Sequence, residues 1–425
     1  MNILLQTIGS RGDVQPFVAL GKGLQDAGHT VTVCTAGRFE GFVQENGLDY
    51  AYLNDDLLKL LDSAEGGAII EDMGSLVSGI RTGLRLIRET GPIMRALIRE
   101  GWEAATRIKP DLIVYHPKMG IAEHYAEKLG IRGVQASLIA QFVPTSEFPT
   151  IGFPTWNLGG AYNHLTYRFV LSVAKRIGRK YLKEWRTQHG LPPLSRKADM
   201  LHANDGRPIP ILHAFSKHVI SRPSDWPDSA DITGYWFLDR SQDWNPPNEL
   251  ASFVDEGAPP VYVGFGSMAG RNPERLARIV VGALEKSGLR GILATGWGGL
   301  KPENLPASVL VIDDAPHDWL FPRVAAVVHH GGAGTTAAGL RAGKPTIVCP
   351  FFGDQPFWGR RVDELGVGPA PIPQKKLTVV NLSEALQKAT KDPTIRANAA
   401  ALGEKIRAED GVKEAVRLIG TIAST

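Results

Sequence analysis

The chain has 425 residues, 43% of them hydrophobic and 21% charged, which is the composition of a folded protein long enough for two domains. Its formal net charge of +3 gives no basis for nucleic-acid binding, and two cysteines cannot build a disulfide framework or a zinc site. The sequence shows no signal peptide and no run of about 18 apolar residues, so we expect a cytoplasmic protein without a membrane span.

The first half of the chain alternates short apolar runs with amphipathic segments, a pattern typical of a parallel α/β domain. The apolar runs are continuous, as they are in strands that are buried on both faces of a sheet. In chain order the pattern predicts a strand at Ile3–Thr7, a helix at Pro16–Ala27, strands at Thr30–Thr35 and Asp111–Tyr115, a helix at Ile121–Leu129 and a strand at Gly133–Ala136.

A second series of strands is predicted in the C-terminal half, at Val261–Phe265, Gly291–Ala294, Val309–Ile312, Ala325–His329 and Thr346–Pro350. Between the two series the chain is rich in proline and polar residues, so we place an N-terminal domain at residues 1–222 and a linker at residues 223–246. Ligands of doubly wound domains bind at the C-terminal ends of the strands, and we expect the two sheets to face a shared cleft.

Two segments are strongly basic. Arg168–Arg186 contains seven Lys and Arg residues against the single acidic residue Glu184, and Arg81–Lys109 is similar but contains three glutamates. Such charge runs usually form a solvated helix face. The alternative is a patch that makes peripheral contact with a membrane surface and helps the protein to reach a lipid-like acceptor.

Residues 325–340 have the pattern of a strand, a glycine-rich turn and a helix. Gly332 and Gly334 allow the backbone to approach a ligand closely, and the start of the helix offers free N–H groups at the positive end of its dipole. The segment therefore predicts a pyrophosphate site. Thr335 and Thr336 add hydroxyls, and His330 adds a cationic donor that can stabilise a departing phosphate.

The same turn also fits the G-x-G-x-x-A pattern of dinucleotide-binding sites, with Asp354 twenty residues after Gly334. That pattern normally follows the first strand of its domain, whereas three predicted strands precede it here. The paired histidines His329 and His330 also have no role in it. We therefore favour a nucleotide diphosphate over NAD.

The turn His330–Thr336 and the segment Pro350–Pro356 together resemble the donor signature of family-one glycosyltransferases, above all the sterol glucosyltransferases and the glycopeptide-antibiotic glycosyltransferases. Three more segments are similar to the sterol branch, at Gly9–Pro16, Gly264–Met268 and Pro316–Pro322. Because these motifs lie near both ends of the chain, the resemblance covers essentially all of it.

The resemblance implies the GT-B fold, an α/β architecture of two facing Rossmann-like, doubly wound domains. The N-terminal domain would bind the acceptor, and a C-terminal domain at residues 247–399 would bind the nucleotide sugar. The resemblance also implies that a final helix at about Ala400–Ile422, within residues 400–425, packs back onto the N-terminal domain.

Asp13 follows the first predicted strand in a glycine-flanked turn. Its residue type alone leaves two roles open, a general base for an acceptor hydroxyl or a cap for the helix expected from Pro16. Burial would raise the pKa of Asp13 from about 3.9 towards working pH. The resemblance favours Asp13 as the general base, and Asp354 is the alternative base. It also implies that Ser10, Arg11 and Gly12 lie near the donor phosphates and the acceptor.

The resemblance also implies roles on the donor side. His330 would contact the donor phosphates, and Ser267 would bind a phosphate or form part of a hinge. Asp354 and Gln355 would hydrogen-bond the sugar hydroxyls. We expect the backbone at Pro316 and His317 to hold the uracil edge, whereas Trp297 either flanks the base or packs in the core.

A long aromatic and proline-rich segment at residues 142–156 has no regular period. It is either a binding loop or a packed interdomain loop. As a binding loop it would offer Phe142, Phe148 and Phe153 to a flat, apolar acceptor such as a sterol, polyketide or flavonoid, and His116 would assist Asp13.

We therefore expect an inverting transfer of a hexose, glucose from UDP-glucose, to a hydroxyl of a small hydrophobic acceptor. The sequence has no D-x-D motif and no metal-ligand spacing, so neither a metal nor another cofactor is expected. The alternatives are a nucleotide-sugar epimerase or hydrolase on the same fold, and a nucleotide-sugar-binding protein without turnover.

Overall fold

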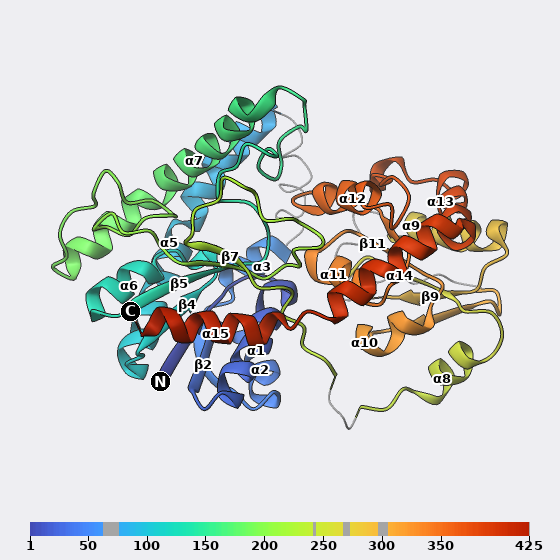
Figure 1. Cartoon of the computed structure of the whole chain (residues 1–425), viewed down its shortest axis with the longest axis horizontal. Helices are drawn as coiled ribbons and strands as arrows, with labels where there is room; N and C mark the ends of the chain where they lie inside the picture. The colour runs from blue at the N-terminus through green and yellow to red at the C-terminus, as the bar shows by residue number, and fades with distance from the viewer. Residues whose placement is uncertain (63–75, 241–243, 267–272, 296–304, 425) are drawn as a thin grey trace. The chain divides into compact units, whose positions relative to one another are not determined.

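The computed structural model describes residues 1–62, 76–240, 244–266, 273–295 and 305–424. Its contacts divide the chain into two units, Met1–Leu238 together with Asp410–Thr425, and Asp239–Glu409 (Figure 1). The expected two-domain α/β architecture with parallel sheets is confirmed. The boundary between the units falls inside the segment 223–246, whose first part supplies a strand to the first sheet.

The first unit is built on a seven-stranded parallel sheet with the order β3-β2-β1-β4-β5-β6-β7. Each of the four strands predicted here is present within one residue at either end. The sheet also contains β3, β6 and β7, which the apolar pattern did not predict. The strands are β1 (Asn2–Gln6), β2 (Thr30–Ala36), β3 (Asp49–Leu53), β4 (Leu112–Tyr115), β5 (Arg132–Ser137), β6 (Ile211–His213) and β7 (Ala230–Ile232).

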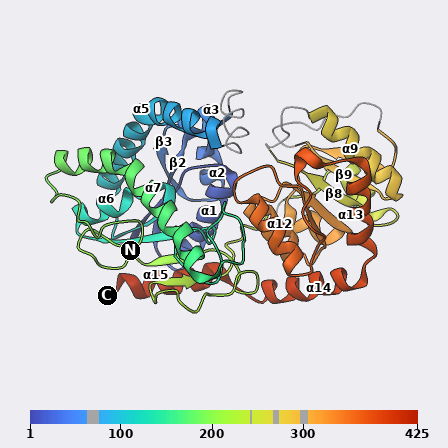
Figure 2. The same ribbon diagram turned by 90° about the horizontal axis from the view of Figure 1, so that it is seen from above.

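Helices cover both faces of this sheet, because successive strand residues point to opposite sides. Ile3 and Leu5 of β1 pack against helices α1 and α15, whereas Leu4 packs against α5 and α6. Figure 2 shows α5 on one side of the strands and α15 on the other. The helices are α1 (Arg11–Asp26), α2 (Glu40–Glu45), α3 (Asp56–Asp62), α5 (Leu76–Ile108), α6 (Ala122–Leu129), α7 (Gly159–Gln188) and α15 (Gly411–Ala423), with 3₁₀ turns η1 (Gly37–Phe39) and η2 (Pro117–Met119).

Helix α1 begins at Arg11, five residues before the predicted start at Pro16. Ser10 is its N-cap residue, and Oδ2 of Asp13 accepts a hydrogen bond from the Ser10 N–H at 2.8 Å. This reciprocal cap stabilises the first turn, so Pro16 lies inside the helix rather than at its start.

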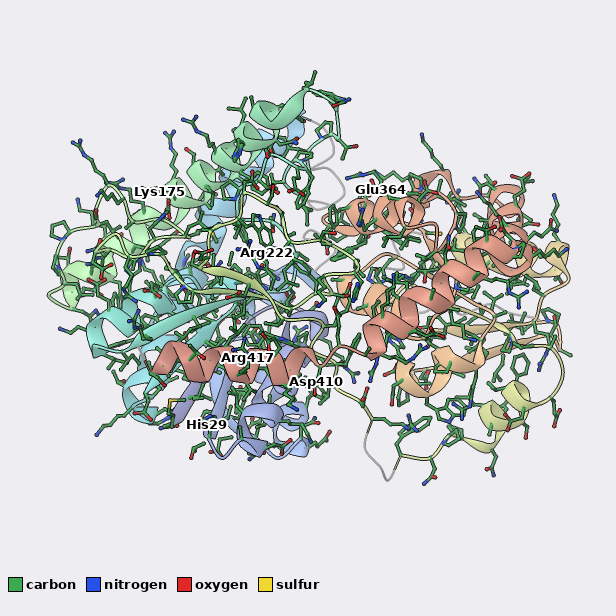
Figure 3. All side chains as sticks on the ribbon, viewed as in Figure 1. His29, Lys175, Arg222, Glu364, Asp410 and Arg417 are labelled. Atoms are coloured by element: carbon green, nitrogen blue, oxygen red, sulfur yellow. The ribbon has the colours of Figure 1, made fainter. Side chains whose placement is uncertain are left out.

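The C-terminal segment forms two helices rather than the single one expected at Ala400–Ile422. Helix α14 (Pro393–Arg407) belongs to the second unit, and α15 belongs to the first. Asp410, labelled in Figure 3, caps α15 by accepting from the Lys413 N–H at 3.0 Å. Helix α15 packs so closely on α1 that a Cβ at Gly23 would lie only 2.2 Å from Cγ1 of Val412.

The second unit is built on a five-stranded parallel sheet with the order β10-β9-β8-β11-β12, and all five of its strands were predicted. They are β8 (Val261–Gly264), β9 (Gly291–Ala294), β10 (Val309–Ile312), β11 (Ala326–His329) and β12 (Thr346–Val348). Helices α9 and α13 pack on one face, and α8 and α10 pack on the other. The helices are α8 (Asn248–Asp255), α9 (Pro273–Ser287), α10 (His317–Leu320), α11 (Ala333–Arg341), α12 (Gln355–Glu364), α13 (Val379–Lys391) and α14, with 3₁₀ turns η4 (Phe321–Arg323) and η5 (Gln374–Lys376).

Within the described residues, no helix combines the length and the apolar character that crossing a membrane requires.

Candidate active site

The first unit places a group of polar side chains at the C-terminal ends of β1 and β4. Asp13 lies in the first turn of α1, just after β1, and His116 and Lys118 follow β4. Oδ1 of Asp13 accepts from Lys118 Nζ at 2.8 Å and lies 3.6 Å from Nε2 of His116. Oδ2 accepts from the N–H and hydroxyl of Ser10 at 2.8 and 3.2 Å. The Asp13 carboxylate is therefore held from both sides.

Gly9 makes room for this arrangement. Its φ of +145° lies in the region that favours glycine, and a Cβ there would lie 2.1 Å from Oδ2 of Asp13 and 2.8 Å from Lys118 Nζ. Any side chain at position 9 would displace the carboxylate or its cation. Glycine at position 9 is thus required by close approach as well as by backbone conformation.

The charges around Asp13 shift its pKa in a direction opposite to the one expected. Burial raises the pKa, as predicted, but Lys118, His116 and the hydrogen bonds of Lys118 and Ser10 lower it more. The net pKa lies below the ordinary value, so Asp13 is ionised at neutral pH. The prediction that burial would bring the pKa of Asp13 towards working pH is wrong, because it did not take account of the Lys118 ammonium beside the carboxylate.

His116 is buried and neutral. Burial lowers its pKa to about 4, against an opposing effect of Asp13. Its Nδ1 accepts from the Lys118 N–H at 3.2 Å, so the ring proton is on Nε2, which faces Asp13. In this tautomer His116 can orient the carboxylate but cannot itself remove a proton through Nε2.

Lys118 is the residue of this group that sequence reasoning missed. It is one hundred and five residues from Asp13 in the chain, and the two meet only because β1 pairs with β4. The signal available in the sequence was its position two residues after His116, at the end of a predicted strand.

The other residues expected near Asp13 are more exposed. Gly12 lies on the surface of the first turn of α1. The Arg11 side chain donates to Oε1 of Gln15 at 3.2 Å, and its guanidinium lies 5.2 Å from the ring centre of Phe42. Both residues stay candidates for contact with ligand, while Ser10 is occupied with Asp13.

The aromatic segment is tied to its own unit. Ser146 N donates to Asp225 at 2.6 Å, and Glu147 accepts from Ser224 N at 2.7 Å. Asn163 of α7 donates to the carbonyl of Ser146 at 2.7 Å. These bonds give the loop a fixed path within the first unit. The three candidate acceptor residues of the loop, Phe142, Phe148 and Phe153, are half-buried.

In the second unit, the glycine-rich turn lies between β11 and α11 as predicted. Gly332 is the N-cap residue of α11 and has no side-chain cap. The first hydrogen bond of the helix is donated by the Thr336 N–H to the Gly332 carbonyl. The amides before Thr336 are the ones that an α-helix leaves without an internal partner. Together with the positive end of the helix dipole, they form an anion-binding arrangement.

The two histidines of this turn have different surroundings. His329 is buried, and its Nδ1 accepts from the Gly331 N–H at 2.9 Å, which fixes the turn. The His330 ring lies against Gly332, where a Cβ would come within 2.6 Å of its Nε2. Among the described residues, the buried Nδ1 of His330 has no hydrogen-bond partner. His330 therefore retains hydrogen-bonding capacity beside the start of α11.

His330 is not the cation that the sequence suggested. Burial, reinforced by His317, lowers the pKa of His330 to about 4, so the ring is neutral at pH 7. A neutral imidazole still donates one N–H, and a diphosphate beside it would raise its pKa.

The acidic and amide side chains after β12 are held by their own segment. Trp358 Nε1 donates to Oδ2 of Asp354 at 2.8 Å. Oε1 of the buried Gln355 accepts from the N–H groups of Phe351 and Phe352 at 2.7 and 3.2 Å. Only the amide nitrogen of Gln355 is thus left to meet a sugar hydroxyl, whereas Asp354 is oriented by an indole that the sequence did not single out.

The remaining donor residues differ in accessibility. Thr336 is buried and its hydroxyl donates to the Gly332 carbonyl at 2.9 Å, whereas Thr335 is partly exposed. Pro316 caps α10, and the His317 ring stacks on Phe321 with centroids 4.2 Å apart. Outside the described residues lie the two other predicted donor residues, Ser267 and Trp297.

In the part of the chain that the structure describes, no three His, Cys, Asp or Glu side chains are grouped as metal ligands would be. Both cysteines are buried free thiols, and burial raises the pKa of Cys34 and of Cys349 to about 12.

Two family models match the chain. Residues 3–146 match the glycosyltransferase family 28 N-terminal domain, and residues 299–420 match the erythromycin biosynthesis protein CIII-like, C-terminal domain. Sterol 3-beta-glucosyltransferase UGT80B1 of Arabidopsis thaliana is 37% identical over 98% of the chain and 67% of its own length. The chain belongs to the sterol glucosyltransferase family.

A fungal member, the sterol 3-beta-glucosyltransferase of Emericella nidulans, is 38% identical over 99% of the chain. The chain spans only 30% of the length of that relative. Among solved structures, the calicheamicin glycosyltransferase CalG4 superposes with a TM-score of 0.73 at 18% identity, over 100% of this chain and 98% of its own. That likeness confirms the GT-B fold expected from the sequence.

Proposed function

We propose that this protein transfers glucose from UDP-glucose to a hydroxyl of a small hydrophobic acceptor, with inversion at the anomeric carbon and without a metal ion. The observation that carries the proposal is the identity to enzymes named sterol 3-beta-glucosyltransferases over almost the whole chain. The proposal assigns the acceptor to the first unit and the nucleotide sugar to the second.

Asp13 is the proposed general base. Its carboxylate is ionised at neutral pH and lies at the C-terminal edge of the sheet, where ligands of this architecture bind. In the proposed step the acceptor hydroxyl gives its proton to Asp13 as its oxygen bonds to the anomeric carbon. The bond between that carbon and the diphosphate oxygen breaks on the opposite side, and its electron pair leaves with UDP.

A base with a lowered pKa accepts a proton weakly, so the contacts of Asp13 matter for the rate. Lys118 is half-exposed, and its ammonium can move into solvent when an acceptor approaches. Burial would then raise the pKa of Asp13 with less opposition, while the Nε2–H of His116 continues to orient the carboxylate.

The departing diphosphate would be stabilised by the start of α11 and by His330. The amides at this helix terminus are fixed in place before the reaction, so they need no reorganisation as charge develops. Asp354, oriented by Trp358, would accept a hydrogen bond from a sugar hydroxyl.

The test is incubation with UDP-glucose labelled in the sugar and a panel of aglycones that includes sterols, flavonoids and polyketides, with and without excess EDTA. We expect a labelled glycoside with β configuration, formed equally in EDTA. A need for added Mg²⁺ or Mn²⁺ would disprove the metal-free mechanism, and an α-glycoside would disprove inversion. Free glucose and UDP without glycoside would identify a hydrolase instead.

A further inference from the structure

Helix α7 carries a row of large apolar side chains that the described structure leaves largely exposed. Leu165, Phe169, Val173 and Ile177, here called the α7 stripe, have exposed fractions of between 40% and 61%. They are spaced four residues apart, so they lie along one gradually turning face of the helix. Trp156 and Leu158, each 62% exposed, precede the helix.

The middle of α7 makes little contact with the rest of its unit. Its buried residues are confined to the two ends, at Asn163, Thr166 and Tyr167 and at Trp185 and Arg186. The C-terminal end is fixed to α5 by the ion pair between Arg95 and Glu184 at 3.0 Å. Figure 1 shows α7 running along the margin of the first unit beside α5. The exposed face therefore lies between two ends of the helix that are packed on the rest of the unit.

The charge of α7 is one-sided. It contains seven Lys and Arg residues and one acidic residue, a net charge of +6, while the whole chain has a net charge of only +3. The only acidic side chain, Glu184, is paired with Arg95. In Figure 3, basic side chains extend from α7 around the labelled Lys175, whose ammonium donates to the Arg196 carbonyl at 2.9 Å. Exposed basic residues beside and beyond the stripe are Arg168, Arg176, Arg179, Lys180 and Lys183.

We propose that the α7 stripe and its flanking basic residues dock this protein on the surface of an anionic lipid bilayer. A helix with a long apolar stripe and adjoining Lys and Arg residues lies in the interface with its apolar side chains among the acyl chains and its cations near the headgroups. A protein partner would need an acidic surface with an apolar centre, whereas an anionic bilayer offers both features along the full length of the helix.

The stripe adjoins the candidate acceptor segment. The rings of Phe153 and Phe169 meet edge to face with centroids 5.9 Å apart, and Trp156 packs on Tyr162 at the same distance. A bilayer bound at α7 would thus touch the loop proposed to receive the acceptor. The delivery of an acceptor from the bilayer to this loop rests on the proposed function, but docking itself does not depend on the reaction.

The test is co-sedimentation with vesicles of phosphatidylcholine alone or mixed with phosphatidylserine, at low and high salt. We expect the wild type to bind the mixed vesicles, and to bind them less in high salt because the flanking charges are screened. The variant Leu165→Gln, Val173→Gln, Ile177→Gln should lose binding at least about tenfold, given the cost of removing three inserted apolar groups. Phe169 is left intact because it contacts Phe153.

A second variant, Arg176→Glu with Lys180→Glu, should bind mixed vesicles much more weakly than the wild type does. The binding that remains should no longer depend on salt, because the cations that salt screens have been removed. The controls lie on α13, with Val380→Gln matching the exposure of Ile177 and Lys388→Glu with Lys391→Glu matching the charge change. Both controls should bind like the wild type.

Failure of the wild type to bind either kind of vesicle, or binding by the α7 variants equal to that of the wild type, would overturn the proposal. So would light scattering that shows a dimer for the wild type and a monomer for the triple variant, because the stripe would then join two copies of the chain. Transfer to a water-soluble acceptor should be unchanged in the α7 variants, which separates loss of docking from failure of the proposed reaction.

Discussion

Asp13 has a structural and a proposed chemical role, and two substitutions separate them. Its Oδ2 accepts from Ser10 at the start of α1, and its Oδ1 faces Lys118 and His116. Asp13→Asn keeps an oxygen for the Ser10 N–H but removes the charge and the proton acceptor, whereas Asp13→Ala removes both functions. The two variants should therefore share a kinetic defect and differ in stability.

The expected magnitudes follow from these contacts. Loss of a general base lowers kcat by about 10² to 10⁴, which corresponds to about 3 to 5 kcal/mol in the barrier. Loss of a helix cap costs about 1 kcal/mol, which lowers the Tm of a unit of this size by about 2 to 4 °C. Asp13→Asn should show the kinetic defect with a nearly normal Tm, and Asp13→Ala should show both.

The assay is kcat for transfer from labelled UDP-glucose, together with Tm from thermal denaturation. Asp26→Asn is the matched control, because Asp26 lies exposed at the other end of α1. A normal kcat in Asp13→Asn would refute the reasoning and reduce the role of Asp13 to capping. Asp354→Asn would then be the variant to examine.

Three further substitutions test the electrostatics of the two units. Lys118→Met removes a cation that lowers the pKa of Asp13, so the acid limb of the kcat/KM profile should move to higher pH; an unmoved limb would mean that the limb does not report Asp13. His330→Ala should lower kcat by about 10² to 10³ because a preorganised donor to the leaving group is lost, while His29→Ala should leave kcat unchanged. Burial raises the pKa of Glu123 to about 7, so the folded state binds the proton more tightly than the unfolded state does, and stability falls as pH rises from the ordinary pKa to about 7. Glu123→Gln should therefore stabilise the protein by about 2 kcal/mol more at pH 8 than at pH 5, and equal effects at both pH values, measured by chemical denaturation, would contradict the raised pKa.

The apolar pattern predicted the strands that consist of several consecutive aliphatic residues, such as β4 and β11, because burial on both faces leaves a local signal. It did not predict β3, in which Asp49 and two tyrosines interrupt the apolar residues, or β6 and β7, which have three residues each. Such short or mixed strands form because they pair with a neighbouring strand, and that pairing leaves no local apolar pattern in the sequence.

The candidate site was predictable to a similar extent. The glycine-rich turn is local, so its place at the start of α11 could be predicted, but the neutral state of His330 depends on burial and on His317, which only the fold reveals. The same holds for Asp13, whose pKa is set by Lys118 across the sheet. In each case residue type and motif indicated position, and long-range packing determined charge.

The close packing of α15 on α1 has a consequence for the order in which the protein folds. The core of the first unit includes Ala415 and Ile419, which follow the whole of the second unit in the chain. The second unit, by contrast, is continuous from Asp239 to Glu409. During translation the second unit can therefore complete its core while the first unit still lacks the covering helix α15. The first unit begins to form before the second but is completed after it.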